Sequence, residues 1–217
     1  MTFTRSSGDG KFASEILVGY EAGYRHLVTH NFSVDFAAFF NNYNHLLSSE
    51  RGAPFDESSP PPEHTINPLA IGNGLMGSTT GFEIVPNWKP ADWWRLEGSY
   101  SYLNMDLKNR PGSSDMATVR SNEGSSPRHQ VGVKSYLDLP GRVEFSQAFR
   151  YITALPAQSI ASYGTADARI AWHVVKQVEF SVVGQNLLQP HHAEYGGDPG
   201  TLVLIRRSVF AAMTWRK

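Results

Sequence analysis

The segment 81–103, GFEIVPNWKPADWWRLEGSYSYL, interleaves bulky aromatic side chains with charged ones almost residue by residue. From residue 94 onward, one set of alternate positions carries Trp, Leu, Gly, Tyr and Tyr, and the positions between them carry Arg, Glu, Ser and Ser. Successive side chains point to opposite faces of a β-strand, whereas a helix would scatter these groups around its circumference. The segment therefore predicts a strand with one apolar face and one charged face.

The same period of two recurs along the whole chain. Most of the repeating segments reach the roughly 9–11 residues that a tilted strand needs to cross a bilayer. No run approaches the roughly 18 apolar residues of a spanning helix, so a membrane role requires strands. We count about nine such segments, at residues 14–26, 32–47, 76–88, 94–106, 128–139, 142–153, 163–173, 177–187 and 203–216.

The connections between these segments are alternately short and long. The short ones lie near VTHN, KPAD, LPGR and HVVK. The others are SERGAPFDESSPPPEHTINP, KNRPGSSDMATVRSNEGSSP, QPHHAEYGGDPG and a medium one around TALPAQSIAS, and the composition of the first two predicts mobile loops. Membrane barrels have short periplasmic turns and longer extracellular loops. The pattern thus predicts an all-β fold, an antiparallel up-and-down transmembrane β-barrel segment with about nine strands of a larger barrel.

Aromatic and charged residues fit the two sides of such a wall. The tryptophans lie beside the short connections, where a membrane-interface girdle is expected; they are Trp88, Trp93, Trp94, Trp172 and Trp215. The charged positions of the alternating segments would face the lumen, because an Arg at mid-bilayer costs about 2–4 kcal/mol. These lumen-facing candidates either contact a plug or a solute or merely hydrate the wall, and they are Glu83, Arg95, Glu97, Arg150, Asp167 and Arg169.

Composition excludes several classes of function. The formal net charge of −1 and the pI of about 6.7 provide no basic surface for nucleic acid. The absence of cysteine excludes disulfides, thiol catalysis and zinc–thiolate sites. No histidine spacing predicts a metal site, and no hydroxyl nucleophile is paired with a histidine, so we predict no enzyme, no catalytic residue, no metal and no cofactor. Three loop residues are candidate ligand contacts, although solvation alone also explains them: Arg120, His191 and His192.

An isolated sheet of nine strands would not be stable in lipid. Its two unpaired edges would cost on the order of tens of kcal/mol, because each unmet backbone group in hydrocarbon costs several. With periplasmic short turns, residues 1–13 would begin outside the cell and the ninth strand would end in the periplasm, whereas single-chain bacterial barrels have even strand numbers. We therefore expect part of a larger barrel. The alternatives are a small self-sufficient outer-membrane barrel (an enzyme or adhesin) and a soluble β-domain.

The segment ASEILVGYEAGYRHLVTHNFSVDFAAFFNNYNHL resembles a pattern of TonB-dependent outer-membrane receptors, a strand bearing YE.GYR, a tight turn and then D.A.FYN.Y. The opening segment 81–103 and SPRHQVGVKSYLDLP, DARIAWHV, EFSVVGQNLLQPHHAEY and RRSVFAAMTWRK are similar to successive late barrel strands of that family. The resemblance covers nearly the whole chain. It implies that residues 1–217 are the C-terminal portion of a plugged barrel of about 22 strands, with the plug domain and early strands absent.

The resemblance further implies a receptor of the bacterial outer membrane. Its activity would be TonB-energised uptake of a scarce solute such as a ferric siderophore or cobalamin. The implied partners are membrane lipid, the N-terminal plug with the early strands, TonB through that plug, the barrel-assembly machinery and a small-molecule metal chelate. One position departs from the pattern, since the family usually ends in an aromatic residue used in barrel assembly and this sequence has Lys217 there.

Overall fold

The computed structural model describes residues 1–8, 10–196 and 202–216, so Lys217 lies outside the described residues. The chain separates into two compact units, each built from several stretches of sequence. The first unit contains Met1–Tyr20, Phe39–Thr80 and Asn104–Gly124, and the second contains Glu21–Ala38, Gly81–Leu103 and Ser125–Lys217. No helix among the described residues is long and apolar enough to cross a membrane.

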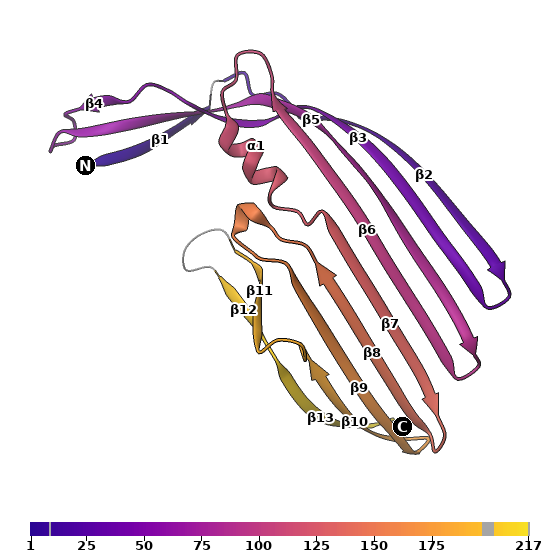
Figure 1. The fold of residues 1–217 in the computed structure, drawn as a ribbon. Coiled ribbons are helices and arrows are strands. Elements are labelled where there is room, and N and C mark those ends of the chain that lie inside the picture. Colours follow the sequence, from indigo (N-terminus) through magenta and orange to yellow (C-terminus); the bar gives the residue numbers. More distant parts are fainter. Residues whose placement is uncertain (9, 197–201, 217) are drawn as a thin grey trace. The chain divides into compact units, whose positions relative to one another are not determined.

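Nine strands pair side by side in the order β13-β10-β9-β8-β7-β6-β5-β3-β2, within the described part of the chain (Figure 1). In chain order they are β2 (Ile16–Thr29), β3 (Phe32–Arg51), β5 (His64–Ala91), β6 (Trp94–Asn109), β7 (His129–Leu139), β8 (Val143–Ile152), β9 (Tyr163–Val175), β10 (Val178–Gln185) and β13 (Ser208–Trp215). Each predicted segment overlaps one of these strands, and the strands from β6 to β10 pair antiparallel with their neighbours in this order, as does β13 with β10. The predicted nine-strand sheet is confirmed.

The connections also follow the predicted alternation. Two-residue turns at 30–31, 92–93 and 176–177 and a three-residue turn at 140–142 alternate with connections of ten residues or more. The turn between β5 and β6 lies at Asp92 and Trp93 rather than across KPAD, because β5 continues to Ala91. In the β7–β8 turn, Gly141 and Arg142 both have positive φ, a conformation that glycine adopts without steric cost.

β5 is longer than the sequence predicted. Its 28 residues begin at His64, where alternation is obscured by Pro68, Gly72 and Gly74. Two short strands pair with its first part: β1 (Thr2–Gly8) in parallel from Thr65 to Ile71, and β4 (Phe55–Glu57) antiparallel from His64 to Ile66. The prediction that this stretch belongs to a loop was wrong, because β1, from the start of the chain, and the nearby β4 both pair with it as a strand. β1 is also the parallel exception in a fold predicted to be antiparallel.

The connection between β6 and β7 contains an ordered helix, α1 (Met116–Glu123), although composition predicted a mobile loop. Asp115 caps the helix by accepting a hydrogen bond from the Thr118 backbone N–H at 2.9 Å. At the other end, the Glu123 carboxylate accepts a hydrogen bond from the Leu107 backbone N–H at 2.7 Å. Val119 packs with Leu75 and Leu107 in a small hydrophobic core. Packing and capping thus order a segment whose residue types alone indicated mobility.

The long connection after β10 is partly a hairpin. Strands β11 (His191–Tyr195) and β12 (Val203–Arg206) pair antiparallel, from His191 opposite Arg206 to Tyr195 opposite Val203. Ala193 of this hairpin packs against a second small core formed by Leu155, Ile160 and Tyr163. The first two of these residues flank the short 3₁₀ helix Pro156–Gln158 in the β8–β9 connection.

Candidate functional site

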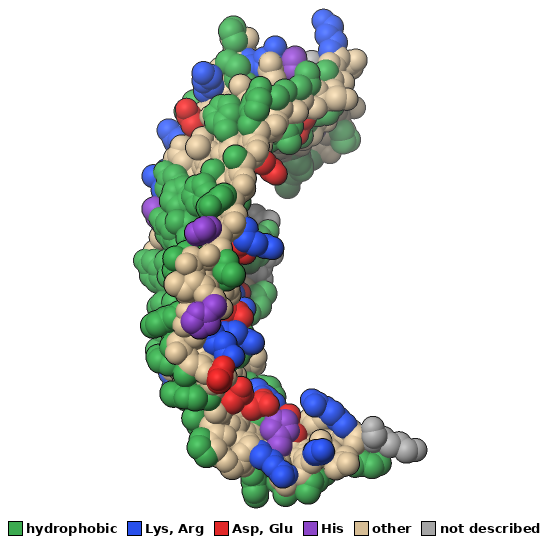
Figure 2. All heavy atoms as spheres, turned by 90° about the vertical axis from the view of Figure 1, so that its right-hand side faces the viewer, with side chains coloured by type: hydrophobic (Ala, Val, Ile, Leu, Met, Phe, Trp, Pro, Cys, Tyr) green, Lys and Arg blue, Asp and Glu red, His purple; other side chains and the backbone are tan. Residues whose placement is uncertain are grey.

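In the second unit, strand register separates the side chains into an apolar face and a polar face (Figure 2). We define the polar face by the row Glu97, Lys134, Ala148 and Asp167, whose members lie opposite one another on β6, β7, β8 and β9. The apolar face carries the alternate residues, and Val133 lies opposite Phe149 within it. The alternation predicted from the sequence therefore corresponds to two distinct surfaces.

The apolar face is uncovered. Phe149, Ile170, Phe180 and Val182 are 41–48% exposed. The buried hydrophobic residues of the second unit, among those described, do not form a layer beneath this face; they are Leu155, Ile160, Tyr163 and Ala171. A continuous apolar surface of this extent is stable against another apolar phase and not against water.

Aromatic side chains lie near the short-turn ends of the apolar face. Trp94 is the first residue of β6, and its Nε1 donates a hydrogen bond to the Ser135 hydroxyl at 3.1 Å. The centre of its ring lies 6.1 Å from that of Trp93 and 6.4 Å from that of Trp88. Trp172 lies opposite Val143 and Phe180 across its two neighbouring strands.

Trp215 pairs with Val178 at the start of β10, so it lies at the same end of the sheet. These positions agree with an interfacial girdle, which stays a prediction.

The polar face contains a hollow of about 510 Å³. Its lining comes from β5, β6, β7, β8 and β9 and combines acidic, basic and hydroxyl side chains. Four predicted lumen-facing residues border it, Glu83, Glu97, Arg150 and Asp167, together with Lys134 and Ser99 among others. The remaining two, Arg95 and Arg169, border a neighbouring hollow on the same face, nearer the short turns.

Most of the predicted lumen-facing charges are partnered. Arg95 lies 3.4 Å from the Glu97 carboxylate, and its guanidinium stacks 4.4 Å from the centre of the Tyr136 ring. Asp167 accepts a hydrogen bond from the Asn186 backbone N–H at 2.8 Å, which orders the residue after β10. Glu97 and Asp167 thus have structural contacts that a solute would have to share.

Arg169 belongs to an ion-pair network that the sequence did not predict. Its guanidinium lies 2.5 Å from the Glu179 carboxylate and 3.5 Å from that of Glu144. His173 contacts Glu144 at 2.9 Å, and Arg216 approaches Glu179 at 3.9 Å. Glu179, only 7% exposed, therefore joins β9 to the end of β13. Sequence alternation placed Arg169 on the charged face, but only strand register shows which charges it meets.

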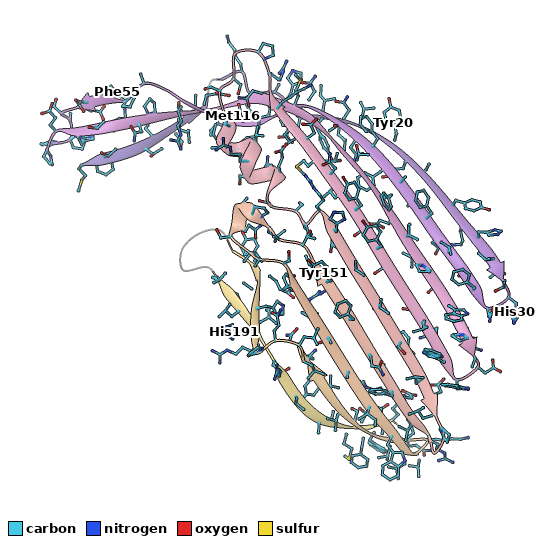
Figure 3. All side chains as sticks on the ribbon, viewed as in Figure 1. Tyr20, His30, Phe55, Met116, Tyr151 and His191 are labelled. Carbon is cyan, nitrogen blue, oxygen red and sulfur yellow. The ribbon has the colours of Figure 1, made fainter. Side chains whose placement is uncertain are left out.

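Arg150 is paired with a residue from the hairpin. Its Nη2 lies 2.6 Å from Glu194 Oε1, and the same oxygen lies 3.0 Å from His192 Nε2. His192 is 6% exposed and stacks on Tyr163 with ring centres 4.6 Å apart. Its neighbour His191 is exposed, as strand alternation requires (Figure 3). The two histidines therefore occupy different environments.

Arg120, the third loop candidate, is an exposed residue of α1 in the first unit. The structure does not bring it together with the histidines in one described site. No group of three or more acidic or histidine side chains in the described residues is arranged to hold a metal ion. The ligand roles of the three candidates stay predictions.

The family model described as TonB dependent receptor-like, beta-barrel matches residues 1–187. The chain belongs to this receptor family. Receptor barrels of this family reside in the bacterial outer membrane, and they are transporters rather than enzymes. No curated protein matches the sequence.

Solved structures of receptor barrels resemble the fold at low sequence identity. The siderophore receptor PirA from Acinetobacter baumannii is 15% identical, with a TM-score of 0.68 over 97% of this chain and 33% of that receptor. The FrpB iron transporter from Neisseria meningitidis is 11% identical, with a TM-score of 0.70 over 97% of this chain and 31% of that protein. The copper transporter OprC is 11% identical, with a TM-score of 0.66 over 94% of this chain and 32% of that transporter. The chain thus spans about a third of the length of the receptors it resembles.

Proposed function

We propose that residues 1–217 form the C-terminal portion of the β-barrel of an outer-membrane receptor that takes up a scarce solute with energy delivered through TonB. The observation that carries this proposal is the two-faced wall of the second unit. No described residues form a layer over its apolar face, and its polar face carries a hollow lined by charges. Hydrocarbon on one side and an aqueous lumen on the other satisfy both faces.

The two outer strands of the sheet support the view that further strands complete the barrel. β2 pairs only with β3, and β13 pairs only with β10, among the described strands. All fourteen residues of β2 are exposed. Unpaired backbone groups in hydrocarbon cost several kcal/mol each. Early barrel strands from outside these residues would satisfy both edges, with a plug filling the lumen and providing the segment that TonB contacts.

The solute that we propose is a small-molecule metal chelate, such as a ferric siderophore or cobalamin. The structurally similar proteins include a siderophore receptor, an iron transporter and a copper transporter. A plugged lumen blocks passive diffusion of such a solute, so its uptake requires the energy that TonB would deliver. Membrane lipid and the barrel-assembly machinery are the partners that the wall itself requires.

Uptake by cells tests the proposal. A strain lacking the receptor gene should grow poorly when its cognate iron chelate is the sole iron source, and restoring the gene should restore accumulation of radiolabelled iron. Deleting TonB in the restored strain should abolish that accumulation and leave the receptor in the outer-membrane fraction. Accumulation that is unchanged without TonB, or a receptor found in the soluble fraction, would contradict the proposal.

A further inference from the structure

Arg150 lines the hollow on the polar face of the second unit. Its register partners are Gly132 on β7 and Thr165 on β9. The Ser99 hydroxyl occupies the space over Gly132, since a Cβ at that position would come within 2.4 Å of it. The Arg150 side chain is half exposed. It therefore borders the hollow of the polar face with room for a group to approach it.

The position in front of Arg150 already holds a carboxylate. Glu194 Oε1 lies 2.6 Å from Arg150 Nη2 and 3.0 Å from His192 Nε2. Glu194 and Arg150 are 44 residues apart, and both side chains remain accessible to solvent, at 34% and 50%. Accessible ion pairs contribute little net stability, because water and ions compete for each partner. A dissolved carboxylate can compete in the same way.

The backbone beside Glu194 is fixed independently of Arg150. The His192 ring stacks on Tyr163, and Ala193 packs against the small core that contains Tyr163. Displacing the Glu194 side chain from Arg150 therefore does not require the strand to leave the wall. The carboxylate retains the His192 contact when the guanidinium binds another group.

A second cation lies next to Arg150. Lys134 is diagonal to it across the β7–β8 pair, since Arg150 is opposite Gly132 and Lys134 is opposite Ala148. Lys134 forms no ion pair with any described residue, and it lines the hollow. Of the acidic residues in the same lining, Asp167 accepts the Asn186 N–H and Glu97 contacts Arg95, whereas Glu83 faces the hollow as a further carboxylate. Two cations with accessible donors thus face one space.

We propose that Arg150, assisted by Lys134, binds a carboxylate group of the transported solute, and that Glu194 occupies this position in the free protein. The guanidinium fork matches the planar geometry of a carboxylate, and the internal occupant of the site is itself a carboxylate. The inference rests on the proposed uptake function and specifies its substrate class. The solute is an anionic chelate that carries at least one free or weakly metal-bound carboxylate.

Citrate titration tests this site. The barrel is purified in detergent from outer membranes, together with whatever strands the cell assembles with it, and citrate binding is measured by calorimetry. Arg150→Gln should weaken citrate binding about tenfold, the loss expected for a hydrogen bond to a charged group. Arg150→Lys should restore part of it, and Glu194→Gln should tighten it severalfold by removing the internal competitor. Arg142→Gln, in the β7–β8 turn, is the matched control and should change nothing.

Each variant must show the heat-modifiable electrophoretic mobility of a folded barrel. Three results would overturn the inference. The first is equal citrate affinity in Arg150→Gln and in the unaltered protein, and the second is no citrate binding in either the unaltered protein or Glu194→Gln. The third is weaker citrate binding in Glu194→Gln than in the unaltered protein. TonB-dependent uptake with citrate binding indifferent to Arg150 would remove the inference and leave the proposed function intact. Arg150-dependent citrate binding without TonB-dependent uptake would contradict the proposed function and leave the Arg150 site in place as a carboxylate site.

Discussion

The small core beside α1 in the first unit and the wall of the second unit differ in how their apolar side chains are placed. In the first unit, Leu75 is fully buried, and Leu107 and Val119 pack against it beneath a capped helix. In the wall of the second unit, Val133 and Phe180 are 44% and 46% exposed on a face that nothing in the described chain covers. The first arrangement is how a protein folds in water, and the second is how one folds against lipid. One polypeptide thus contains regions adapted to two solvents.

This comparison explains why similar residue types have different consequences. A large-to-small change leaves a cavity in the first unit, whereas lipid chains can fill the space left on the apolar face of the second. A charge is excluded from the apolar face, whereas in the first unit the buried carboxylate of Asp115 caps α1. The predictions below distinguish changes in the buried core from changes on the apolar face.

The largest effect is expected from Leu75→Ala, which should destabilise the small core by about 2–5 kcal/mol through lost burial and a residual cavity. The change should be local, so limited proteolysis of the folded barrel should cut the 110–128 connection much faster. Leu139→Ala, at a 37% exposed position in the second unit, is the control and should have a much smaller effect. Equal losses in both variants would remove the distinction between the units.

Val133→Arg places a charge at the middle of the apolar face of β7 and should cost about 2–4 kcal/mol. The measurement is the fraction of barrel that folds into lipid vesicles at increasing urea. Gln130→Arg makes the same change on the polar face of the same strand and should fold almost normally. If the two variants behaved alike, the apolar face would not be in contact with hydrocarbon.

Asp115→Ala should cost about 1 kcal/mol, the usual loss on removing a helix N-cap, and should expose α1 to protease. Burial alone would raise the pKa of Asp115, but hydrogen bonds from Thr118, Ser49 and Ala117 lower it below its ordinary value. A carboxyl with a lowered folded-state pKa contributes stability that is present above its unfolded value of about 3.9 and is lost as pH falls through the folded value. Protease resistance of this connection should therefore fall in acid, and the acid sensitivity should disappear in the variant.

The smallest effect is expected from Asp92→Asn in the β5–β6 turn. The Lys89 ammonium lies 2.7 Å from the Asp92 carboxylate and lowers its pKa. Asp92 is fully exposed, so water screens the pair and its loss should not measurably change the urea midpoint of the folded barrel. A clear destabilisation here would mean that the short turns are packed against something other than solvent.

The strands could be predicted because they depend on local chemistry. Alternation with a period of two follows from strand geometry, so each stretch between Phe32 and Trp215 with that pattern indicates a strand whatever its neighbours are. The short turns at 30–31, 92–93, 140–142 and 176–177 then define neighbouring strands and their antiparallel order. The faces of Glu97 and Arg150 follow from parity alone. This is why nine strands could be predicted from the sequence, whereas the lumen-facing roles of the six candidates stay predictions.

The contacts across the long connections could not be predicted in this way. The start of β5 is a strand because β1 and β4 pair with it, and α1 is ordered because Val119 meets Leu75 and Leu107. The Arg150–Glu194 pair joins residues 44 positions apart, and the position of Glu194 depends on a hairpin packed against Tyr163. The amino-acid composition of a connection shows neither how the connection folds nor which residues it contacts.

By itself, the sequence of this protein determined that the wall has two faces in two solvents, because the alternation of side chains is a property of neighbouring residues. The tertiary structure alone decided which charges on the polar face are paired with one another and which stay accessible. Ion pairs between distant residues depend on strand register and loop packing, and these are set only when the whole sheet is assembled.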